Sequence, residues 1–294
     1  MMGKRELLAI VLAVGSAAGL ARSAKARSGV ATFSTIDFPG ATWTYATGVN
    51  RHGEIVGSYC LTSDCTFTGS HGFVRSAAGM FRTLDMPGAL YTALYGVNNG
   101  GDVAGTYCDD GTCTAQHGLV YSNGGLWTTL DYPGAAATAA LGINTGGDVV
   151  GLFDPGDGTA HGFVWRAGVF SSVEPAGSVQ SSAAGIDNAG DIVGWYEDSG
   201  HVQHAYTLTG GTFATIDVPG ALRTAGHAIN GGGDVAGLYT DTGHHAHGFE
   251  VRGGVLTYID DPFGADSEAW GINTAGHIVG SYYDGTAWHG FLLK

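Results

Sequence analysis

The sequence is short of charge, and of positive charge most of all. Only 13% of its 294 residues are charged, and 12 lysines and arginines stand against 26 aspartates and glutamates. Nucleic acids and anionic membranes attract basic surfaces, because their phosphates bind lysine and arginine. With a net charge of −14, the chain is expected to have neither a nucleic-acid partner nor an anionic lipid partner.

Long apolar runs are also missing, except near the start. No stretch beyond residue 30 approaches the roughly 18 apolar residues of a membrane-spanning helix. The start of the chain has basic residues at Lys4 and Arg5, an apolar segment over 7–20, and a small-x-small sequence ending at Ala26. This order is typical of a secretory signal peptide. We expect residues 1–26 to be removed and the protein to be secreted, extracellular or periplasmic, with no membrane association afterwards; the alternative is an uncleaved anchor.

Cysteine is scarce, and the four cysteines form two short pairs. Cys60 and Cys65 have the same spacing as Cys108 and Cys113. In an exported protein this pattern predicts two local disulfides, each closing a loop. The alternative is one zinc ion held by all four thiolates, which requires reduced cysteines.

Glycine is abundant, and the chain repeats itself. With 52 glycines and few charges, the composition argues against a helical bundle and favours short strands joined by tight turns. Six copies of about 43 residues share an acidic residue before a turn, an Asn or Asp at the end of the next strand, and a His opening the third strand. The acidic residues are Asp37, Asp85, Asp131, Glu174, Asp217 and Asp260; the strand-ending residues are Asn50, Asn98, Asn144, Asp187, Asn230 and Asn273; the histidines are His71, His117, His161, His204, His247 and His289.

This period predicts an all-β fold, a six-bladed β-propeller formed by a single domain over residues 31–294. Each copy carries four strand signals, in the first copy over 45–50, 54–59, 72–76 and 81–85. The last copy stops before a fourth strand, and an additional strand stands at 32–37. Pairing that N-terminal strand with the last blade closes the ring and removes both sheet edges. A β-solenoid or prism is the alternative.

The recurring Ile-Asp-x-Pro-Gly-Ala, Gly-Ile-Asn-x-x-Gly-Asp-Val-Val-Gly and His-Gly-Phe sequences resemble the bacterial HAF extracellular repeat family, named for a His-Ala-Phe triplet. The triplet mostly reads His-Gly-Phe here, and becomes His-Gly-Leu at His117 and His-Ala-Tyr at His204. The resemblance covers residues 32–294. It implies an exported repeat protein, and it brings no common activity or catalytic residues with it.

Sixfold recurrence assigns the histidines and acidic residues to structure, because one active site does not need six bases. We expect each histidine to hydrogen-bond a neighbouring turn, such as the recurring acid. The segment His244-His245-Ala246-His247 after Asp241 is denser in histidine and is a weaker candidate for a metal site. Loops around Asp110 and Asp154 resemble calcium-binding turns in composition only. We therefore predict no metal and no cofactor, with calcium as a minor alternative.

The fold does not require a particular residue at a position that differs between copies. We therefore expect a ligand site among such positions. Two such positions lie between the turn and the first strand of each copy, and a third lies just before the glycine of that strand; we expect the loops that carry them to surround one mouth of the channel. They read Trp43, Tyr91, Ala137, Gln180, Arg223, Ser267; then Thr44, Thr92, Thr138, Ser181, Thr224, Glu268; then Thr47, Tyr95, Leu141, Ala184, His227, Trp270. The candidate ligand-binding residues are Trp43, Tyr91, Arg223, His227, Glu268 and Trp270, because aromatic platforms with a few polar groups suit sugar rings or small organic ligands.

Three functions fit this sequence. The favoured one is a non-enzymatic exported binding propeller, with a carbohydrate or an extracellular protein as its partner. The second is a polysaccharide lyase or glycosidase, with Glu268 and His227 as acid and base and Arg223 holding a uronate carboxylate. The third is a structural surface or matrix protein. No catalytic residue is assigned, because no serine elbow, zinc-protease motif or phosphate loop is present.

Overall fold

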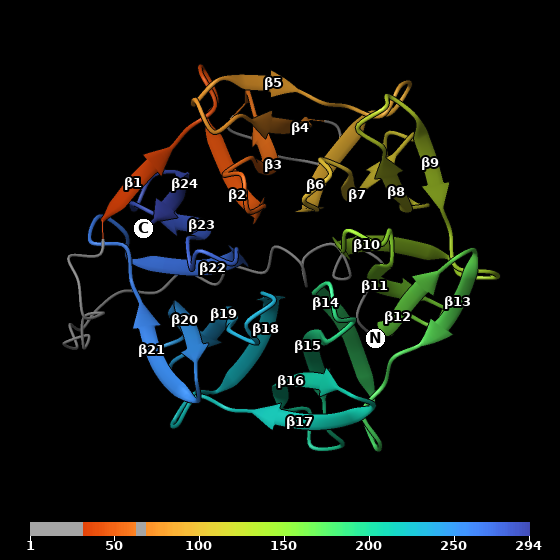
Figure 1. The fold of residues 1–294 in the computed structure, drawn as a ribbon, viewed down its shortest axis with the longest axis vertical. Helices are drawn as coiled ribbons and strands as arrows, with labels where there is room; N and C mark the ends of the chain where they lie inside the picture. Colours follow the sequence, from red (N-terminus) through yellow and green to blue (C-terminus); the bar gives the residue numbers. More distant parts are fainter. Residues whose placement is uncertain (1–31, 63–68) are drawn as a thin grey trace.

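The computed structural model describes residues 32–62 and 69–294. These residues form six four-stranded antiparallel sheets, without any helix in the part described. The sheets stand as blades around a central channel, with the first strand of each blade innermost and the fourth outermost (Figure 1). The predicted six-bladed β-propeller is confirmed. None of the described residues forms a helix long and apolar enough to cross a membrane.

The blades follow one another along the chain. Blade 1 contains β2 (Trp43–Val49), β3 (Ile55–Cys60), β4 (Ser70–Arg75) and β5 (Phe81–Thr83). Blade 2 contains β6 (Tyr91–Val97), β7 (Val103–Cys108), β8 (His117–Tyr121) and β9 (Trp127–Leu130). Blade 3 contains β10 (Ala137–Ile143), β11 (Val149–Asp154), β12 (His161–Arg166) and β13 (Val169–Ser172). Blade 4 contains β14 (Gln180–Ile186), β15 (Ile192–Glu197), β16 (Gln203–Thr209) and β17 (Thr212–Ile216). Blade 5 contains β18 (Arg223–Ile229), β19 (Val235–Thr240), β20 (Ala246–Arg252) and β21 (Val255–Ile259). Blade 6 contains β22 (Asp266–Ile272), β23 (Ile278–Tyr283), β24 (Trp288–Leu293) and, as its outer strand, β1 (Phe33–Ile36).

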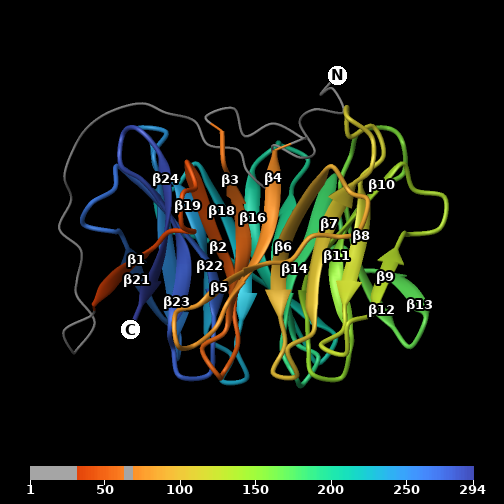
Figure 2. The ribbon, with the colours of Figure 1, turned by 90° about the horizontal axis from the view of Figure 1, so that it is seen from above.

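The two ends of the propeller domain meet in blade 6. Strand β1 pairs antiparallel with β24, from Phe33 opposite Leu293 to Ile36 opposite Gly290. The predicted closure is therefore confirmed, and the solenoid alternative is wrong. The inner strands run from one face of the ring to the other (Figure 2). We call the face where the inner strands begin, beside Cys60, the disulfide face, and the opposite face, where they end, the hairpin face.

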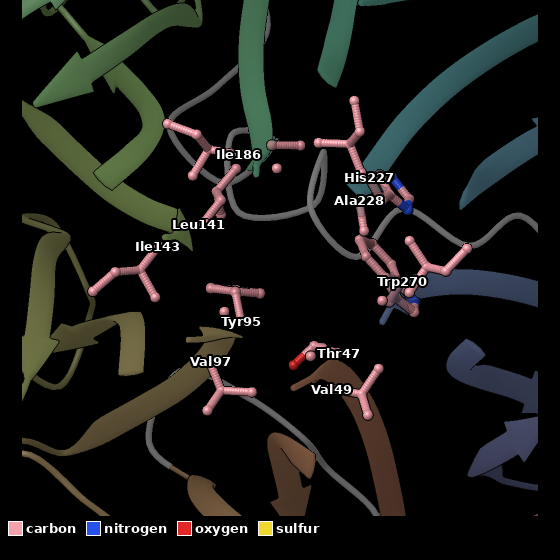
Figure 3. A pocket seen from close by; sticks show the side chains of 18 of the residues that line it. Thr47, Val49, Tyr95, Val97, Leu141, Ile143, Ile186, His227, Ala228 and Trp270 are labelled. Carbon is pink, nitrogen blue, oxygen red and sulfur yellow. The ribbon is translucent and has the colours of Figure 1, made fainter. Parts of the chain in front are cut away.

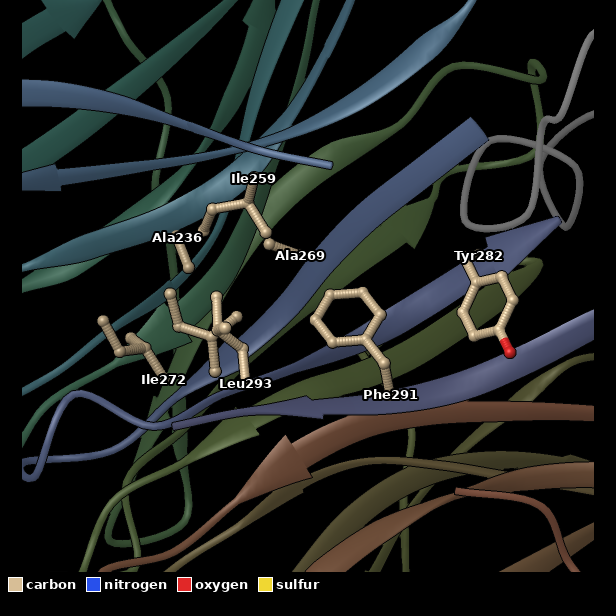
Figure 4. Packing of buried hydrophobic residues seen from close by; sticks show 8 residues of the cluster. Ala236, Ile259, Ala269, Ile272, Tyr282, Phe291 and Leu293 are labelled. Carbon is tan, nitrogen blue, oxygen red and sulfur yellow. The ribbon is translucent and has the colours of Figure 1, made fainter. Parts of the chain in front are cut away.

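The core lies between neighbouring blades. Ala236 and Ile259 of blade 5 pack against Ile272, Phe291 and other apolar residues of blade 6 (Figure 4). Within a blade, the first two strands also lie very close together. Gly151, in the second strand of blade 3, shows how close: a Cβ there would lie 1.9 Å from the carbonyl oxygen of Ala139.

The repeated histidines bond the repeated acids, as expected. In every blade the histidine that opens the third strand meets the carboxylate that follows the fourth strand, with Nδ1 to oxygen distances between 2.8 and 3.0 Å. The sixth bridge joins residues from the two ends of the domain and reinforces the closure. The pairs are His71–Asp85, His117–Asp131, His161–Glu174, His204–Asp217, His247–Asp260 and His289–Asp37.

These bridges make stability depend on pH. Hydrogen bonding to Asp260 raises the pKa of His247, whose Nε2 also faces Asp241 at 3.5 Å. The stabilisation is therefore complete below about pH 6.5, the ordinary pKa, and is lost as the pH rises through the raised pKa. We expect His247→Gln to cost roughly 0.5–1 kcal/mol at pH 5.5 and little at pH 9, measured by thermal melting across that range. The exposed His52→Gln is the control; an equal cost of His247→Gln at both pH values would contradict the bridge.

A second ring of hydrogen bonds surrounds the hairpin-face mouth of the channel. The asparagine that ends each inner strand donates from Nδ2 to the backbone oxygen of its counterpart in the next blade, at 3.0–3.1 Å. Blade 4 carries Asp187 there, and a carboxylate cannot donate to Asn230 O. The ring is therefore broken at one link. The donors are Asn50, Asn98, Asn144, Asn230 and Asn273.

Completing this ring should stabilise the protein. In Asp187→Asn the side-chain oxygen can still accept from Ala189 N and Asp191 N, and the new amide can donate to Asn230 O. We expect a gain of about 1 kcal/mol, or a rise in Tm of roughly 2–4 °C, measured by thermal melting. Asp198→Asn is the matched control, because Asp198 also accepts two backbone bonds and lies outside the ring. No gain over that control would mean that the broken link costs nothing.

Candidate functional site

The channel holds a cavity of about 120 Å³ at the level of the third variable position (Figure 3). A β-bulge interrupts each inner strand at this position, and a glycine follows it in every blade except blade 5, where Ala228 follows His227, so the side chains at this level reach the channel. The lining is mainly apolar on the side of blades 3 and 4 and aromatic on the side of blades 5 and 6. The ring consists of Thr47, Tyr95, Leu141, Ala184, His227 and Trp270.

The six candidate residues do not form one site. His227 and Trp270 line the cavity together. Glu268 is 2% exposed and is not part of the lining. The other three, Trp43, Tyr91 and Arg223, are the first residues of β2, β6 and β18, so they lie toward the disulfide face and outside the cavity lining.

Trp270 connects the two remaining residues. Its ring stacks on His227, with centroids 4.0 Å apart and planes inclined by 2°. Its Nε1 donates to Glu268 Oε2 at 3.1 Å, and the same oxygen accepts from Ser281 Oγ at 3.2 Å. On the other side, His227 Nδ1 donates to Ala269 O at 3.1 Å. The indole therefore separates the carboxyl group from the imidazole.

Burial drives these two groups toward their neutral forms. It raises the pKa of Glu268 to about 7, against smaller opposing effects of its hydrogen bonds and of Arg223. It lowers the pKa of His227 to about 4. Near neutral pH the imidazole is uncharged, and the carboxyl group keeps its proton to a higher pH than an exposed glutamate does. Two titratable groups with opposite shifts are a feature of functional sites, and also of buried structural networks.

The last copy is offset by one residue from the expected alignment. Its first strand position is taken by Asp266 and not by Ser267, because Asp266 pairs with the last residue of β23 as Trp43 pairs with the last residue of β3. Glu268 consequently occupies the position of Tyr45 and does not belong to the second variable position. The turn before β22 keeps its usual length, but Phe263 stands where the other copies have the glycine after proline, and the glycine follows one residue later, at Gly264.

The rim of the disulfide-face mouth is formed by the first residues of the six inner strands. Trp43, Gln180 and Arg223 are half-buried there, whereas Tyr91 and Asp266 are buried. The guanidinium of Arg223 is held in place, since its Nε donates to the side chain of the residue opposite it on β19, at 2.7 Å. The rim thus presents an indole, an amide and a cation at one mouth.

Two aromatic residues that the sequence reasoning missed support this rim. Tyr45 lies 6.4 Å from Trp43 and stacks on Trp288 at 5.7 Å, and Trp288 in turn packs against Tyr283 at 5.5 Å, all between ring centroids. Both residues also depart from their own repeat positions, which are otherwise filled mostly by smaller residues. The same signal that selected the candidates would have found them in an alignment that included the whole first strand and the third strand of each copy.

Asp266 and His245 form a second feature missed from the sequence. Asp266 Oδ1 lies 3.2 Å from His245 Nδ1 and accepts from Ala246 N at 2.9 Å. His247 bonds Asp260 instead, so the two histidines do not converge on one point. Among the described residues, no group of three or more potential ligands could hold a metal ion.

The cysteines form disulfides where the structure describes them. Cys108 is bonded to Cys113, as predicted. Cys60 is also disulfide-bonded, and its expected partner Cys65 lies outside the described residues. Because these sulfurs are oxidised, a zinc site made of all four thiolates does not form.

Comparison with known proteins supports the fold and does not identify the chemistry of the site. No protein-family model matches the chain, and no curated protein sequence matches it either. One similar solved structure is a catalytically inactive virginiamycin B lyase from Staphylococcus aureus with quinupristin, at 13% identity and a TM-score of 0.52, covering 90% of this chain and 99% of that chain. Aleuria aurantia lectin with Fucα1-6GlcNAc matches at 10% identity and a TM-score of 0.53, covering 88% of this chain and 93% of that chain. TolB from Acinetobacter baumannii matches at 11% identity and a TM-score of 0.60, covering 82% of this chain and 64% of that chain. At these identities the likeness shows the propeller fold alone.

Proposed function

We propose that this chain is an exported, non-enzymatic binding protein that holds a carbohydrate at the disulfide-face mouth of its channel. The rim of that mouth is the observation that supports it best, because the six copies carry six different residues there. An aromatic face beside amide and guanidinium groups stacks on a sugar ring and hydrogen-bonds its hydroxyls. Trp43, Gln180 and Arg223 supply these groups, and all three are half-buried.

Two further observations support the proposal. Aleuria aurantia lectin, which has a similar fold and size, is solved with a disaccharide bound. The disulfide between Cys108 and Cys113 fits an oxidising compartment, in agreement with the signal-like sequence at residues 1–26. An extracellular protein is the alternative ligand at the same rim.

A glycan array tests this proposal. The protein should bind a defined set of glycans, and the double variant Trp43→Ala with Arg223→Ala should lose about tenfold or more in affinity for them. Trp127→Ala with Arg82→Ala is the matched control, because these residues lie on the outer strands β9 and β5. Glycan binding that survives the loss of Trp43 and Arg223 would remove this site from consideration.

Catalysis is the second candidate, and the opposite pKa shifts of Glu268 and His227 favour it. A lyase or glycosidase would use Glu268 as the acid and the neutral His227 as the base, with Arg223 binding a uronate carboxylate. Trp270 would have to move, since its indole lies between the two groups. Incubation with acidic polysaccharides decides the question: new reducing ends or the ultraviolet absorbance of an unsaturated uronate would replace the binding proposal with an enzymatic one.

A further inference from the structure

The cavity in the channel differs in chemistry from the rim at the disulfide face. Most of the side chains that line it are apolar, and towards the hairpin face it is ringed by six β-branched side chains. Those same six residues also border a second cavity of about 80 Å³ at the asparagine ring, so the space continues towards the hairpin-face mouth. A sugar with several hydroxyl groups would find few partners in such a lining. The six residues are Val49, Val97, Ile143, Ile186, Ile229 and Ile272.

The shape of the cavity suits a flat ring. One wall is the stacked pair of His227 and Trp270, whose planes are nearly parallel. The inner strand of blade 4 contributes the small residues Ser182, Ala184 and Gly185 at this level, and the indole of Trp195 and the side chain of Ile186 border the cavity beside them. A volume of about 120 Å³ compares with about 150 Å³ for an engineered apolar cavity that binds benzene. One six-membered ring is therefore the appropriate size.

Two polar atoms remain for a ligand. The hydroxyl of Ser182 is fully buried and has no hydrogen-bond partner, although a buried hydroxyl normally finds one. His227 carries its ring proton on Nδ1, where it donates to Ala269 O, so Nε2 is an acceptor. Two further polar groups of the lining are already occupied: Thr47 Oγ1 donates to Leu94 O at 2.6 Å, and Trp270 Nε1 donates to Glu268 Oε2 at 3.1 Å.

From these observations we infer a second ligand site in the channel, for a single aromatic ring bearing one hydroxyl or amino group. The ring lies against the His227–Trp270 pair, and its polar substituent bonds Ser182 Oγ or His227 Nε2. The ligand enters from the hairpin face. This site is separate from the proposed carbohydrate site, which lies at the other end of the inner strands.

Phenol is the probe, with benzene and cyclohexanol as comparators that lack the hydroxyl or the planarity. Binding is measured by titration calorimetry and by saturation-transfer NMR. We expect phenol to bind more tightly than either comparator. Ser182→Ala should weaken phenol roughly five- to tenfold, as expected for one hydrogen bond, and leave benzene unchanged. Ala184→Leu, which fills the cavity, should abolish the binding of all three.

Ala137→Leu is the matched control, because Ala137 begins an inner strand and does not line the cavity. Thermal melting confirms that each variant is folded, and Ala184→Val replaces Ala184→Leu if the larger side chain prevents folding. No binding of phenol to the unmodified protein at millimolar concentration overturns the inference. So does phenol binding that Ala184→Leu or Ala184→Val leaves intact, or that Ala137→Leu abolishes equally. Glycan binding should be unaffected by these cavity variants, so the two sites stand or fall separately.

Discussion

Gly151→Ala should lower the free energy of unfolding by about 3 kcal/mol or more. A Cβ at this position would lie 1.9 Å from Ala139 O and 2.9 Å from the ring of Phe163. The carbonyl belongs to the paired inner strand, so it cannot move without displacing the channel wall. The strands would have to separate, and the hydrogen bonds between β10 and β11 would lengthen. Chemical denaturation at equilibrium measures the change.

Gly111→Ala is the control for this substitution. A Cβ at Gly111 meets nothing within 4 Å, so this variant should remain within about 0.5 kcal/mol of the unmodified protein. Equal stability of the Gly151 and Gly111 variants would show that the inner two strands of a blade are not packed as closely as described. The same substitution at Gly57, where the clash with Tyr45 O is also 1.9 Å, should reproduce the loss.

Glu268→Gln should have the opposite effect and stabilise the protein at alkaline pH. Burial raises the pKa of Glu268 from 4.5 to about 7, so the folded state binds this proton more tightly than the unfolded state. Stability therefore falls as the pH rises from about 4.5 to 7 and stays low above that range. The charged carboxylate costs the folded state on the order of 3 kcal/mol at pH 8, and glutamine removes this cost. Its side-chain oxygen can still accept from Trp270 and Ser281.

Thermal melts from pH 4 to pH 9 test this prediction. The gain of Glu268→Gln over the unmodified protein should be small at pH 4 and grow through the window that ends near pH 7. Glu54→Gln is the control, since Glu54 accepts an amide hydrogen bond from Asn50 outside the cavity, and it should give no such growth. A gain independent of pH would show that the carboxyl group of Glu268 is not held neutral. A confirmed gain would show that Glu268 lowers the stability of the folded protein. Residues that lower stability in this way are common at functional sites.

Most of the fold follows from repetition in the sequence. The acid, the asparagine and the histidine keep their order in all six copies, and the strands predicted for the first copy over 45–50 and 54–59 agree with β2 and β3 to within two residues. The position of the missing fourth strand was also informative, because a ring with unpaired edges would be unstable in solution. The histidine bridges were predictable since each histidine recurs with a carboxylate.

The site was less predictable, because it depends on departures from the repeat. In the last copy the turn reads Asp261-Pro262-Phe263-Gly264, so Phe263 replaces the usual glycine and the glycine comes one residue later, although the turn keeps its length. Counting from the landmark placed Ser267 at the rim, whereas the strand pairing places Asp266 there. Side-chain contacts such as the stacking of Tyr45 on Trp288 join residues that are more than 240 positions apart, and only the closed ring brings them together.

The strand shared between the two ends of the chain sets the order of events during synthesis. Partners in the β1–β24 ladder, such as Ile36 and Gly290, are separated by almost the whole domain. Blade 1 therefore emerges with its neighbour absent, and blade 6 stays incomplete until β24 has been synthesised. Such distant pairings make folding slow, and until the ring closes they leave two sheet edges unpaired, which can bind other chains. The ring can close only when strands from both ends of the domain are present together.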